Sequence, residues 1–321
     1  MNAAFRLLLV SLLFLTTASL LMNAQTSEVT HNTWTTGTAL PTARFGAFTG
    51  AIGANIYVIG GATNSGYQTT DVNQIYNTKK NTWTTGAPDP TTRWSGASAV
   101  VNKILYLIGG QNGVGAPMNL VEAYDPVSDT WTTLAPMPTA RAATSAVVDK
   151  DVIYVIGGYN SATNTWYDTV ESYNTTTNTW TEETPLLEAK SWLTAGLLGA
   201  TIAAVDGNIA PDGDSTNESE SYSVKKNTWT ELTPDPTARQ QSCFATIKGE
   251  LYVAGGWGNG TTLSVNEAYS PKTKSWTTLA SMPDAVLTPG SATLGGRLYC
   301  FGGASDVQLS TVYDYVQIYQ P

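Results

Sequence analysis

The chain has 321 residues and a formal net charge of −9, from 16 Lys+Arg against 25 Asp+Glu. This acidic balance argues against a nucleic-acid-binding protein, because such a protein needs a basic face for the phosphates. The single histidine excludes metal sites built from several histidines and most His-dependent nucleophile systems. An apolar fraction of 42% is enough for a sizeable core.

The N-terminal segment predicts a secretory signal peptide. Residues 1–6 carry one positive charge, and residues 7–22 form a mostly apolar run of sixteen residues interrupted by serines and threonines. Such a run is short for a membrane-spanning helix, which needs about 20 residues. We therefore expect residues 1–24 to be removed and residues 25–321 to be secreted, periplasmic or extracellular, without membrane insertion. The alternative is an N-terminal membrane anchor.

A repeat of about 48 residues governs the rest of the chain. Tryptophan recurs at intervals of 47 to 49 residues, at positions 34, 83, 131, 180, 229 and 276. Gly-Gly pairs keep the same register at 60–61, 109–110, 157–158, 255–256 and 302–303, and Asp206-Gly207 fills the missing place. A period of this length, repeated six times, indicates an array of similar units and is too long for most helical repeats.

Each repeat predicts four short strands. A strand begins about ten residues after the tryptophan, and a second, apolar strand such as residues 56–59 ends at the Gly-Gly pair. A tyrosine follows the pair by thirteen to sixteen residues, and in five repeats the next tryptophan lies seven residues after it, across turn-forming residues. The tyrosine and the tryptophan mark the third and fourth strands.

Residues 105–131 show the full pattern, an apolar run ending in Gly-Gly, then Glu-x-Tyr-Asp-Pro, then a tryptophan. This pattern resembles the Kelch repeat, and the resemblance extends over residues 30–321. It implies an all-β fold, a six-bladed β-propeller of four-stranded blades similar to the central domain of galactose oxidase and to secreted bacterial Kelch proteins.

The two ends of the repeat array are complementary. Trp34 has no tyrosine seven residues before it, and Tyr319 has no tryptophan after it. We therefore expect a strand within residues 30–38 to become the outer strand of the blade built from residues 286–320, which would close the ring and remove a free sheet edge. The alternative is an open array of repeats.

One face of such a propeller is the candidate binding face. With the strands of a blade numbered 1 to 4 from the axis outward, the 2–3 loops and the 4–1 loops share one side, here called the 2–3/4–1 face. Its 2–3 loops are the longest and most variable, and such loops commonly carry function. Aromatic residues outside the repeat pattern map to this face: Trp94, Trp166, Trp192, Trp257, Tyr159, Tyr67 and Phe45. They would stack on sugar rings or anchor a protein partner. The alternative is loop packing between blades.

A cation recurs ten residues after five of the six repeat tryptophans, and Val286 takes the sixth place. The cations are Arg44, Arg93, Arg141, Lys190 and Arg239. Kelch relatives contact acidic peptides with residues at this position, so a cationic ring could bind an anionic ligand. The alternative is structural, because the four repeats of Arg93, Arg141, Lys190 and Arg239 also carry Glu122, Glu171, Glu220 and Glu267. Val286 shares its repeat with Gln317, so matched pairs predict buried ion pairs.

The fourth repeat departs most from the pattern. Its Gly-Gly pair is Asp206-Gly207, and its 2–3 loop, residues 208–218, is acidic. Departures from a local pattern are where functional sites are expected. Asp212, Asp214 and Glu218 could coordinate Ca²⁺, although their spacing does not match an EF-hand loop. The alternative is a solvated acidic loop.

Catalysis would have to rely on carboxylates. The copper site of galactose oxidase and the iron site of plant nitrile-specifier propellers need histidines that this chain lacks, so we expect no cofactor and no such metal. The secreted bacterial sialic-acid epimerase resembles this chain in architecture and uses acid–base chemistry without a cofactor. In that role, Glu188 with Lys190, or Asp168 with Arg141, would act here, although no motif beyond the repeat is shared.

The sequence leaves the state of its two cysteines open. Cys243 and Cys300 would either pair in an oxidising compartment or remain as two buried thiols. The sequence as a whole favours a secreted, monomeric Kelch-repeat module that binds a glycan or a protein or peptide ligand. A cofactor-free carbohydrate epimerase or mutarotase and a scaffold of an envelope complex are the alternatives.

Overall fold

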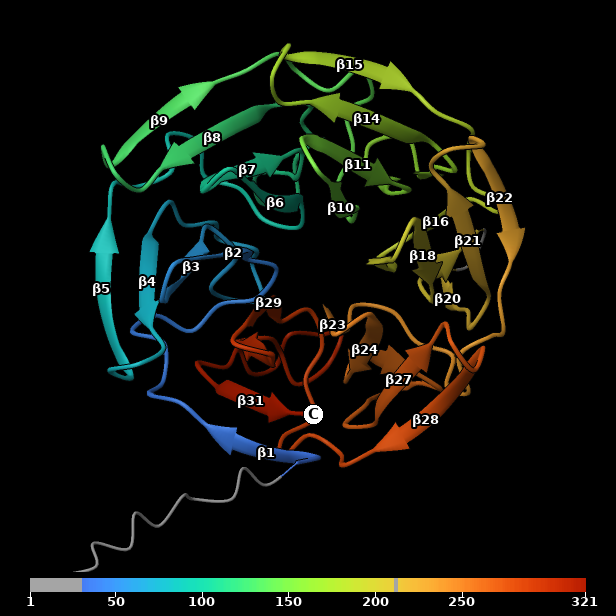
Figure 1. Cartoon of the computed structure of the whole chain (residues 1–321). Helices are drawn as coiled ribbons and strands as arrows, with labels where there is room; N and C mark the ends of the chain where they lie inside the picture. Colours follow the sequence, from blue (N-terminus) through green and yellow to red (C-terminus); the bar gives the residue numbers. More distant parts are fainter. Residues whose placement is uncertain (1–30, 211–212) are drawn as a thin grey trace, which may run out of the picture. The chain divides into compact units, whose positions relative to one another are not determined.

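Six four-stranded antiparallel sheets make up most of the part that the structure, a computed structural model, describes: residues 31–210 and 213–321 (Figure 1). The sheets surround a central axis as blades, each with its first strand at the axis and its fourth at the rim. This is the all-β propeller architecture that the repeat predicts. No helix long and apolar enough to cross a bilayer occurs in the described residues. Residues 1–24, the predicted signal peptide, lie outside them.

The first three blades follow one another along the chain. Blade 1 consists of β2 (Phe48–Ile52), β3 (Asn55–Ile59), β4 (Asn73–Asn77) and β5 (Thr82–Gly86). Blade 2 consists of β6 (Ala97–Val101), β7 (Ile104–Ile108), β8 (Val121–Asp125) and β9 (Thr130–Thr133). Blade 3 consists of β10 (Ser145–Asp149), β11 (Val152–Ile156), β14 (Val170–Asn174) and β15 (Thr179–Glu182).

The last blade takes its outer strand from the other end of the chain. Blade 4 consists of β17 (Thr194–Leu198), β18 (Thr201–Val205), β21 (Ser219–Ser223) and β22 (Thr228–Glu231). Blade 5 consists of β23 (Cys243–Ile247), β24 (Glu250–Ala254), β27 (Asn266–Ser270) and β28 (Ser275–Leu279). Blade 6 consists of β29 (Gly290–Leu294), β30 (Arg297–Phe301), β31 (Val316–Gln320) and β1 (Thr33–Thr36).

Short strands extend three of the blades on the 2–3/4–1 face. They are β12 (Tyr159–Asn160) with β13 (Thr165–Trp166), then β16 (Lys190–Ser191), β19 (Asn208–Ile209) and β20 (Asp214–Ser215), and finally β25 (Trp257–Gly258) with β26 (Thr261–Thr262). They turn the 2–3 loops of blades 3, 4 and 5 into small sheets and so give these loops a defined shape.

The repeat tryptophans join neighbouring blades at the rim. Trp83 pairs with Tyr76 in register, and their ring centroids are 4.9 Å apart. The Trp83 indole N–H donates to the carbonyl of Thr38, which follows the outer strand of blade 6, at 2.8 Å. The other five repeat tryptophans each donate in the same way to the preceding blade. The tryptophan therefore recurs because each blade boundary needs one large side chain and one donor.

β1 belongs to the last blade although it comes first in the chain. It pairs antiparallel with β31, with Trp34 opposite Tyr319. The two rings lie 5.1 Å apart, as in the other blades. The Trp34 indole also donates to the carbonyl of Ala280 in blade 5 at 2.7 Å. The unpaired ends noticed in the sequence thus meet in one sheet.

The glycine pairs bring adjacent blades into close backbone contact. Gly61 donates its N–H to the carbonyl of Arg93 in the next blade at 2.9 Å. At Gly60, with φ near +63°, an added Cβ would lie 2.7 Å from the same carbonyl, so a side chain there meets backbone that cannot easily move. Asp206 takes this position in blade 4 with φ near +60°, a conformation that aspartate tolerates better than most residues.

Cys243 and Cys300 form a disulfide with a Cα–Cα distance of 5.8 Å. The bond joins β23 of blade 5 to β30 of blade 6 and is buried in the core between them. Of the two alternatives that the sequence left open, the paired state is the one observed.

Candidate functional site

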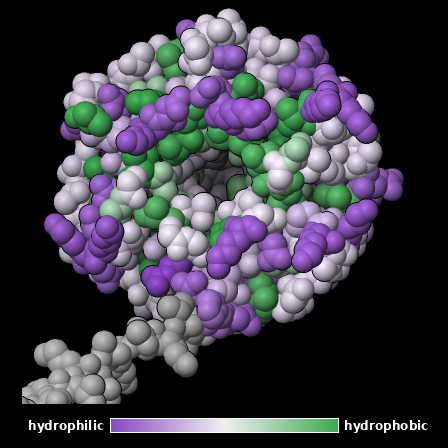
Figure 2. All heavy atoms as spheres, in the orientation of Figure 1, coloured by the Kyte–Doolittle hydropathy of each residue, from purple (hydrophilic) through white to green (hydrophobic). Residues whose placement is uncertain are grey.

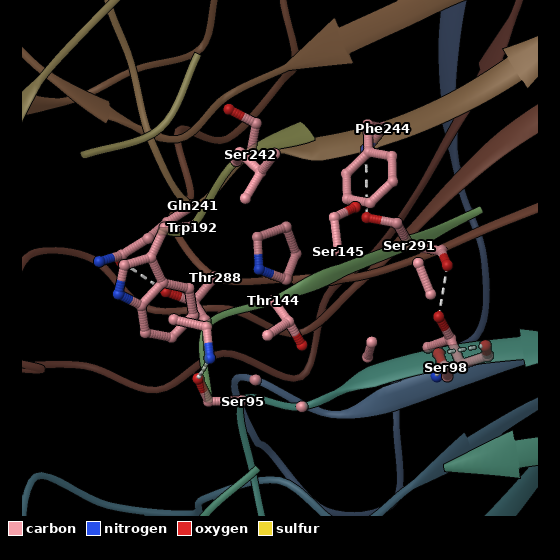
Figure 3. Close-up of a pocket in the computed structure, with 18 of the residues that line it drawn as sticks. Ser95, Ser98, Thr144, Ser145, Trp192, Gln241, Ser242, Phe244, Thr288 and Ser291 are labelled. Carbon is pink, nitrogen blue, oxygen red and sulfur yellow. Dashed lines mark hydrogen bonds between the residues drawn. The ribbon is translucent and has the colours of Figure 1, made fainter. Parts of the chain in front are cut away.

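A cavity of about 160 Å³ lies at the centre of the ring, and residues at the start of all six blades line it. Figure 2 shows the hollow at the centre of the ring, bordered by apolar residues, with hydrophilic residues toward the rim. We call this hollow the axial cavity. In Figure 3, Trp192, Gln241 and Thr288 lie together at one end of it, and Ser145, Phe244 and Ser291 lie at the other.

The mouth of the axial cavity is held by a closed circle of backbone hydrogen bonds. Six equivalent residues form it, one from each blade: Gly46, Ser95, Ala143, Trp192, Gln241 and Thr288. Each donates its N–H to the carbonyl of the one before it, and Gly46 donates to Thr288, over distances of 2.6 to 3.1 Å. We call this circle the mouth ring.

All six residues of the mouth ring have positive φ, between +54° and +61°. This conformation is costly for Trp192 and especially for β-branched Thr288. The hydrogen bonds of the ring offset that strain. They also use the backbone groups, so the side chains are what the mouth presents to a ligand.

The walls of the axial cavity are polar but uncharged. Its hydroxyl and amide side chains come from Thr49, Ser95, Ser98, Thr144, Ser145, Gln241, Ser242, Thr288 and Ser291, and no charged residue lines it. Several of these groups are tied between blades, as when the Thr288 hydroxyl donates to the Gln241 side chain at 2.6 Å. The hydroxyls of Thr144 and Ser145 are buried and have no hydrogen-bond partner among the described residues.

An unpaired buried hydroxyl costs about 1–3 kcal/mol. Ser145 is only 3% exposed, and it faces the axial cavity. The cavity is therefore a place where hydroxyl or carbonyl groups of a small molecule would find donors and acceptors that the protein itself leaves unused.

Aromatic side chains cluster beside the mouth on the 2–3/4–1 face. The Trp94 ring lies 5.3 Å from Phe45, 5.0 Å from Tyr67 and 5.8 Å from Trp192. Trp257 of blade 5 packs against the apolar core that contains Phe45 and Trp94. We call these five residues the aromatic cluster. Trp94 is 6% exposed and its indole donates to the Gly113 carbonyl, so it packs the loops, whereas Trp192 is half-buried and also lines the axial cavity.

Trp166 lies outside the aromatic cluster. It pairs with Tyr159 at 4.7 Å in the β12–β13 hairpin, and its indole donates to the Asn208 side chain at 2.6 Å. This hydrogen bond ties the loop of blade 3 to that of blade 4. Trp166 and Tyr159, both predicted as ligand contacts, thus form a separate pair on these loops.

The predicted cationic ring is buried. Arg44, Arg93, Arg141, Lys190 and Arg239 are each 0% exposed, and none lines the axial cavity. The predicted structural pairs are confirmed. Arg93 contacts Glu122 at 2.7 Å and Lys190 contacts Glu220 at 2.9 Å. Arg141 pairs with Glu171, and Arg239 with Glu267. The paired charges neutralise one another inside the blades. Because Arg44, Arg93, Arg141 and Arg239 are all fully buried, the four arginines considered as ligand contacts have no exposed atoms to offer a ligand.

Two acids of this network were not predicted from the sequence. Asp89 lies 3.3 Å from Arg93, and Asp235 lies 3.2 Å from Arg239. Because burial disfavours the charged form, and because Asp89 is a second acid beside the same arginine, the pKa of Glu122 rises to about 7. The signal was present in the repeat, since the equivalent position is apolar in the other blades: Leu40, Met137, Leu186 and Met282.

The candidate acid–base residues do not meet in the axial cavity. Glu188 is half-buried beside Glu218, and burial followed by that neighbouring carboxyl raises the pKa of Glu188. Lys190 forms an ion pair with Glu220. Asp168 is exposed, and Arg141 is fully buried against Glu171, so no ion pair joins Asp168 to Arg141. None of these residues lines the cavity.

The predicted calcium site falls partly outside the described residues. Asp212 is not among them, while Asp214 and Glu218 are exposed. Within the described ranges no group of three or more His, Cys, Asp or Glu side chains is arranged to hold a metal ion. His31 lies at the rim and hydrogen-bonds to the carbonyl of Pro321 at 2.6 Å.

The hydroxyl groups of the axial cavity were not predicted from the sequence. They follow the cation position of their repeat by two to five residues, in a stretch of small residues that carries no motif. Serine, threonine and glutamine at these positions, where a packed core would take apolar side chains, are the signal that could have found them.

Comparisons with known proteins agree with this architecture. The family model of the Attractin/LZTR1 beta-propeller matches residues 15–266. The solved structure titled "Structure of YjhT" superposes with a TM-score of 0.75 and 17% identity, covering 88% of this chain and 96% of that chain, which shows a shared fold. No curated protein matches by sequence. The match over most of the chain confirms the Kelch-type resemblance, and the chain belongs to the Attractin/LZTR1 β-propeller family.

Proposed function

We propose that this protein is a secreted, monomeric binding module that takes a carbohydrate at the 2–3/4–1 face, with the end of the ligand in the axial cavity. A Kelch-type propeller is a fold of binding and interaction modules. The observation that carries the proposal is Trp192, a half-buried aromatic ring that lines a cavity with uncharged walls and two unpaired hydroxyls.

A sugar has the two kinds of surface that this site complements. Its C–H faces pack on aromatic planes such as Trp192, and its hydroxyls exchange hydrogen bonds with groups such as Ser145 and Gln241. The buried disulfide supports secretion, because such bonds persist in oxidising compartments.

The uncharged walls favour a neutral sugar end over an acidic one. A carboxylate buried without a cation loses its hydration and gains no partner. The same walls weigh against the epimerase alternative, since proton transfer needs a carboxylate or another titratable group within hydrogen-bond reach of the substrate.

The test is a glycan array probed with residues 25–321 and followed by calorimetry on the glycans retained. We expect neutral glycans to be retained and Trp192→Ala to weaken binding at least tenfold, by loss of the stacking surface. Val127→Ala is the control, because Val127 is 89% exposed on the 3–4 loop of blade 2, on the opposite face. Retention of no carbohydrate, or full binding by Trp192→Ala, would overturn the proposal.

A further inference from the structure

A second hollow lies on the 2–3/4–1 face, between blades 5 and 6. It encloses about 490 Å³, within the range of small-molecule sites. One wall is the β25–β26 hairpin, the other is the 2–3 loop of blade 6, and Asp284 and Ala285 of the connecting 4–1 loop complete it. We call this hollow the blade 5–6 groove.

The walls of the groove are fixed before any ligand arrives. The Thr262 hydroxyl donates to the carbonyl of Ser305 at 2.6 Å and so ties the two walls together. Asp306 accepts from the Ser310 N–H at 3.1 Å and from the Ser305 hydroxyl at 3.0 Å. These bonds lower the pKa of Asp306 and hold its loop. A pre-formed groove spares the ordering cost that binding otherwise incurs.

The groove offers aromatic planes and hydrogen-bonding groups together. Trp257 and Tyr313 are half-buried and both line it. Tyr313 is stacked on Tyr315, with centroids 4.4 Å apart and planes 14° apart, which keeps its ring in place. Gln308 and Asp284 are exposed, and no ion pair or hydrogen bond within the described residues engages the Asp284 carboxylate.

The groove is lined by two carboxylates, Asp284 and Asp306, and by no cation. Blade 6 has Val286 and Gln317 in place of the cation–acid pair, and no Lys or Arg lines the groove. Asp306 accepts hydrogen bonds from neutral groups of its own loop, whereas the Asp284 carboxylate has no hydrogen-bond or ion-pair partner among the described residues. An unpartnered carboxylate among hydroxyl and amide groups and aromatic faces matches the hydroxyls and C–H faces of a sugar better than a run of basic side chains.

Trp257 connects the groove to the mouth. It lines the groove and is also a member of the aromatic cluster beside the axial cavity. We propose that the blade 5–6 groove is a second sugar subsite, so that the ligand is a neutral oligosaccharide that runs from the axial cavity over Trp257 to Tyr313. This inference rests on the proposed function, and it adds that the ligand is a chain rather than a single sugar.

The test is calorimetry on residues 25–321 with sugars of two lengths. The probes are glucose and cellotetraose, mannose and mannotetraose, N-acetylglucosamine and chitotetraose, and tetragalacturonic acid as the anionic tetramer. We expect one neutral tetramer to bind at least thirtyfold more tightly than its monosaccharide and far more tightly than the anionic tetramer. Equal affinity of monomer and tetramer for every series overturns the inference, and so does preferred binding of the anionic tetramer.

A matched pair of substitutions locates the effect. Asp284→Asn should weaken tetramer binding about tenfold and leave monosaccharide binding unchanged, because only the longer ligand reaches the groove. Asp314→Asn removes the same charge from the 2–3 loop of blade 6, outside the lining, and it should change neither affinity. Unchanged tetramer binding by Asp284→Asn, or displacement of the tetramer by an arginine-rich peptide in the wild type alone, overturns the sugar assignment.

The two proposals fail in different ways. If monosaccharides bind and Trp192→Ala abolishes that binding, but chain length and Asp284 have no effect, the axial site stands and the groove assignment is wrong. If no neutral sugar of either length binds, both are wrong.

Discussion

Arg44 is the buried cation without a carboxylate beside it. It is fully buried in blade 1, where Gln74 occupies the place of the glutamates in blades 2 to 5. Its guanidinium donates to the carbonyls of Gly60 at 3.0 Å and Val72 at 3.1 Å, and one terminal nitrogen has no partner. Burial accordingly lowers the pKa of Arg44 to about 10. Every other cation of the set has an acid, so this residue is the weak point of the series.

Replacing Gln74 with glutamate should therefore stabilise the protein. The Gln74→Glu variant supplies the missing charge in the same side-chain shape, and we expect a gain of about 1–3 kcal/mol in the free energy of unfolding. Gln317→Glu is the matched control, because its blade has Val286 instead of a cation and the new carboxylate would be buried alone. Thermal unfolding of both variants checks this. Stabilisation by Gln317→Glu, or destabilisation by Gln74→Glu, would contradict the pairing rule.

Asp206 makes stability depend on pH. Burial, and then the neighbouring Asp235, raise the pKa of Asp206 well above its ordinary value. The folded state therefore keeps a proton that the unfolded chain releases near pH 4, and stability falls as the pH rises from there toward the folded pKa. Asparagine tolerates the positive φ and does not titrate. In Asp206→Asn the decrease in the free energy of unfolding should therefore be smaller by up to about 1.4 kcal/mol per pH unit within that window. Urea unfolding from pH 4 to pH 8 measures it, and parallel curves for both proteins would refute it.

At the scale of the strands, the regular features were predictable and the individual ones were not. The tyrosine–tryptophan spacing located the two outer strands. The two residues pair on adjacent strands in each blade, as Tyr76 and Trp83 do, so their spacing recurs with the blade. The cation–acid pairs were predictable because the repeat that lacks the cation also lacks the acid: Val286 and Gln317 take the two places. The axial cavity was not predictable, because each blade contributes only a few small residues to it and no single repeat contains its pattern. The hairpins of the 2–3 loops, such as β12–β13, depend on contacts with the next blade.

The disulfide between β23 and β30 acts at this same scale, as a link between neighbouring sheets. Because it restricts the unfolded chain over 57 residues, replacing both Cys243 and Cys300 with alanine should lower the free energy of unfolding by about 2–4 kcal/mol. The hydrogen bonds within each sheet remain, so the fold should persist. Chemical unfolding of the double variant beside the wild type, each with and without reductant, provides the measurement. A reductant effect in the variant, or none in the wild type, would speak against this role.

For the whole molecule, the pairing of β1 with β31 makes the two ends of the chain depend on each other. Trp34→Ala removes a ring that packs on Tyr319 and a hydrogen bond to Ala280. We expect a loss of about 3–5 kcal/mol and faster hydrogen exchange throughout β31. Trp180→Ala is the comparison, because it removes the equivalent contacts, with Tyr173 and the Ala135 carbonyl, in blade 3, whose strands are continuous in sequence. Equal exchange in β31 for the two variants would show that the terminal strand does not fasten blade 6.

The mouth ring has a consequence for how ligands are selected. Because every one of its six hydrogen bonds joins two blades, widening the opening at one point breaks bonds that the neighbouring points cannot replace. The opening of the axial cavity therefore keeps a fixed width and does not adapt to the ligand. A bulky substituent at the end of the ligand that enters the cavity should therefore prevent binding. A substituent farther along the ligand should instead change its dissociation rate.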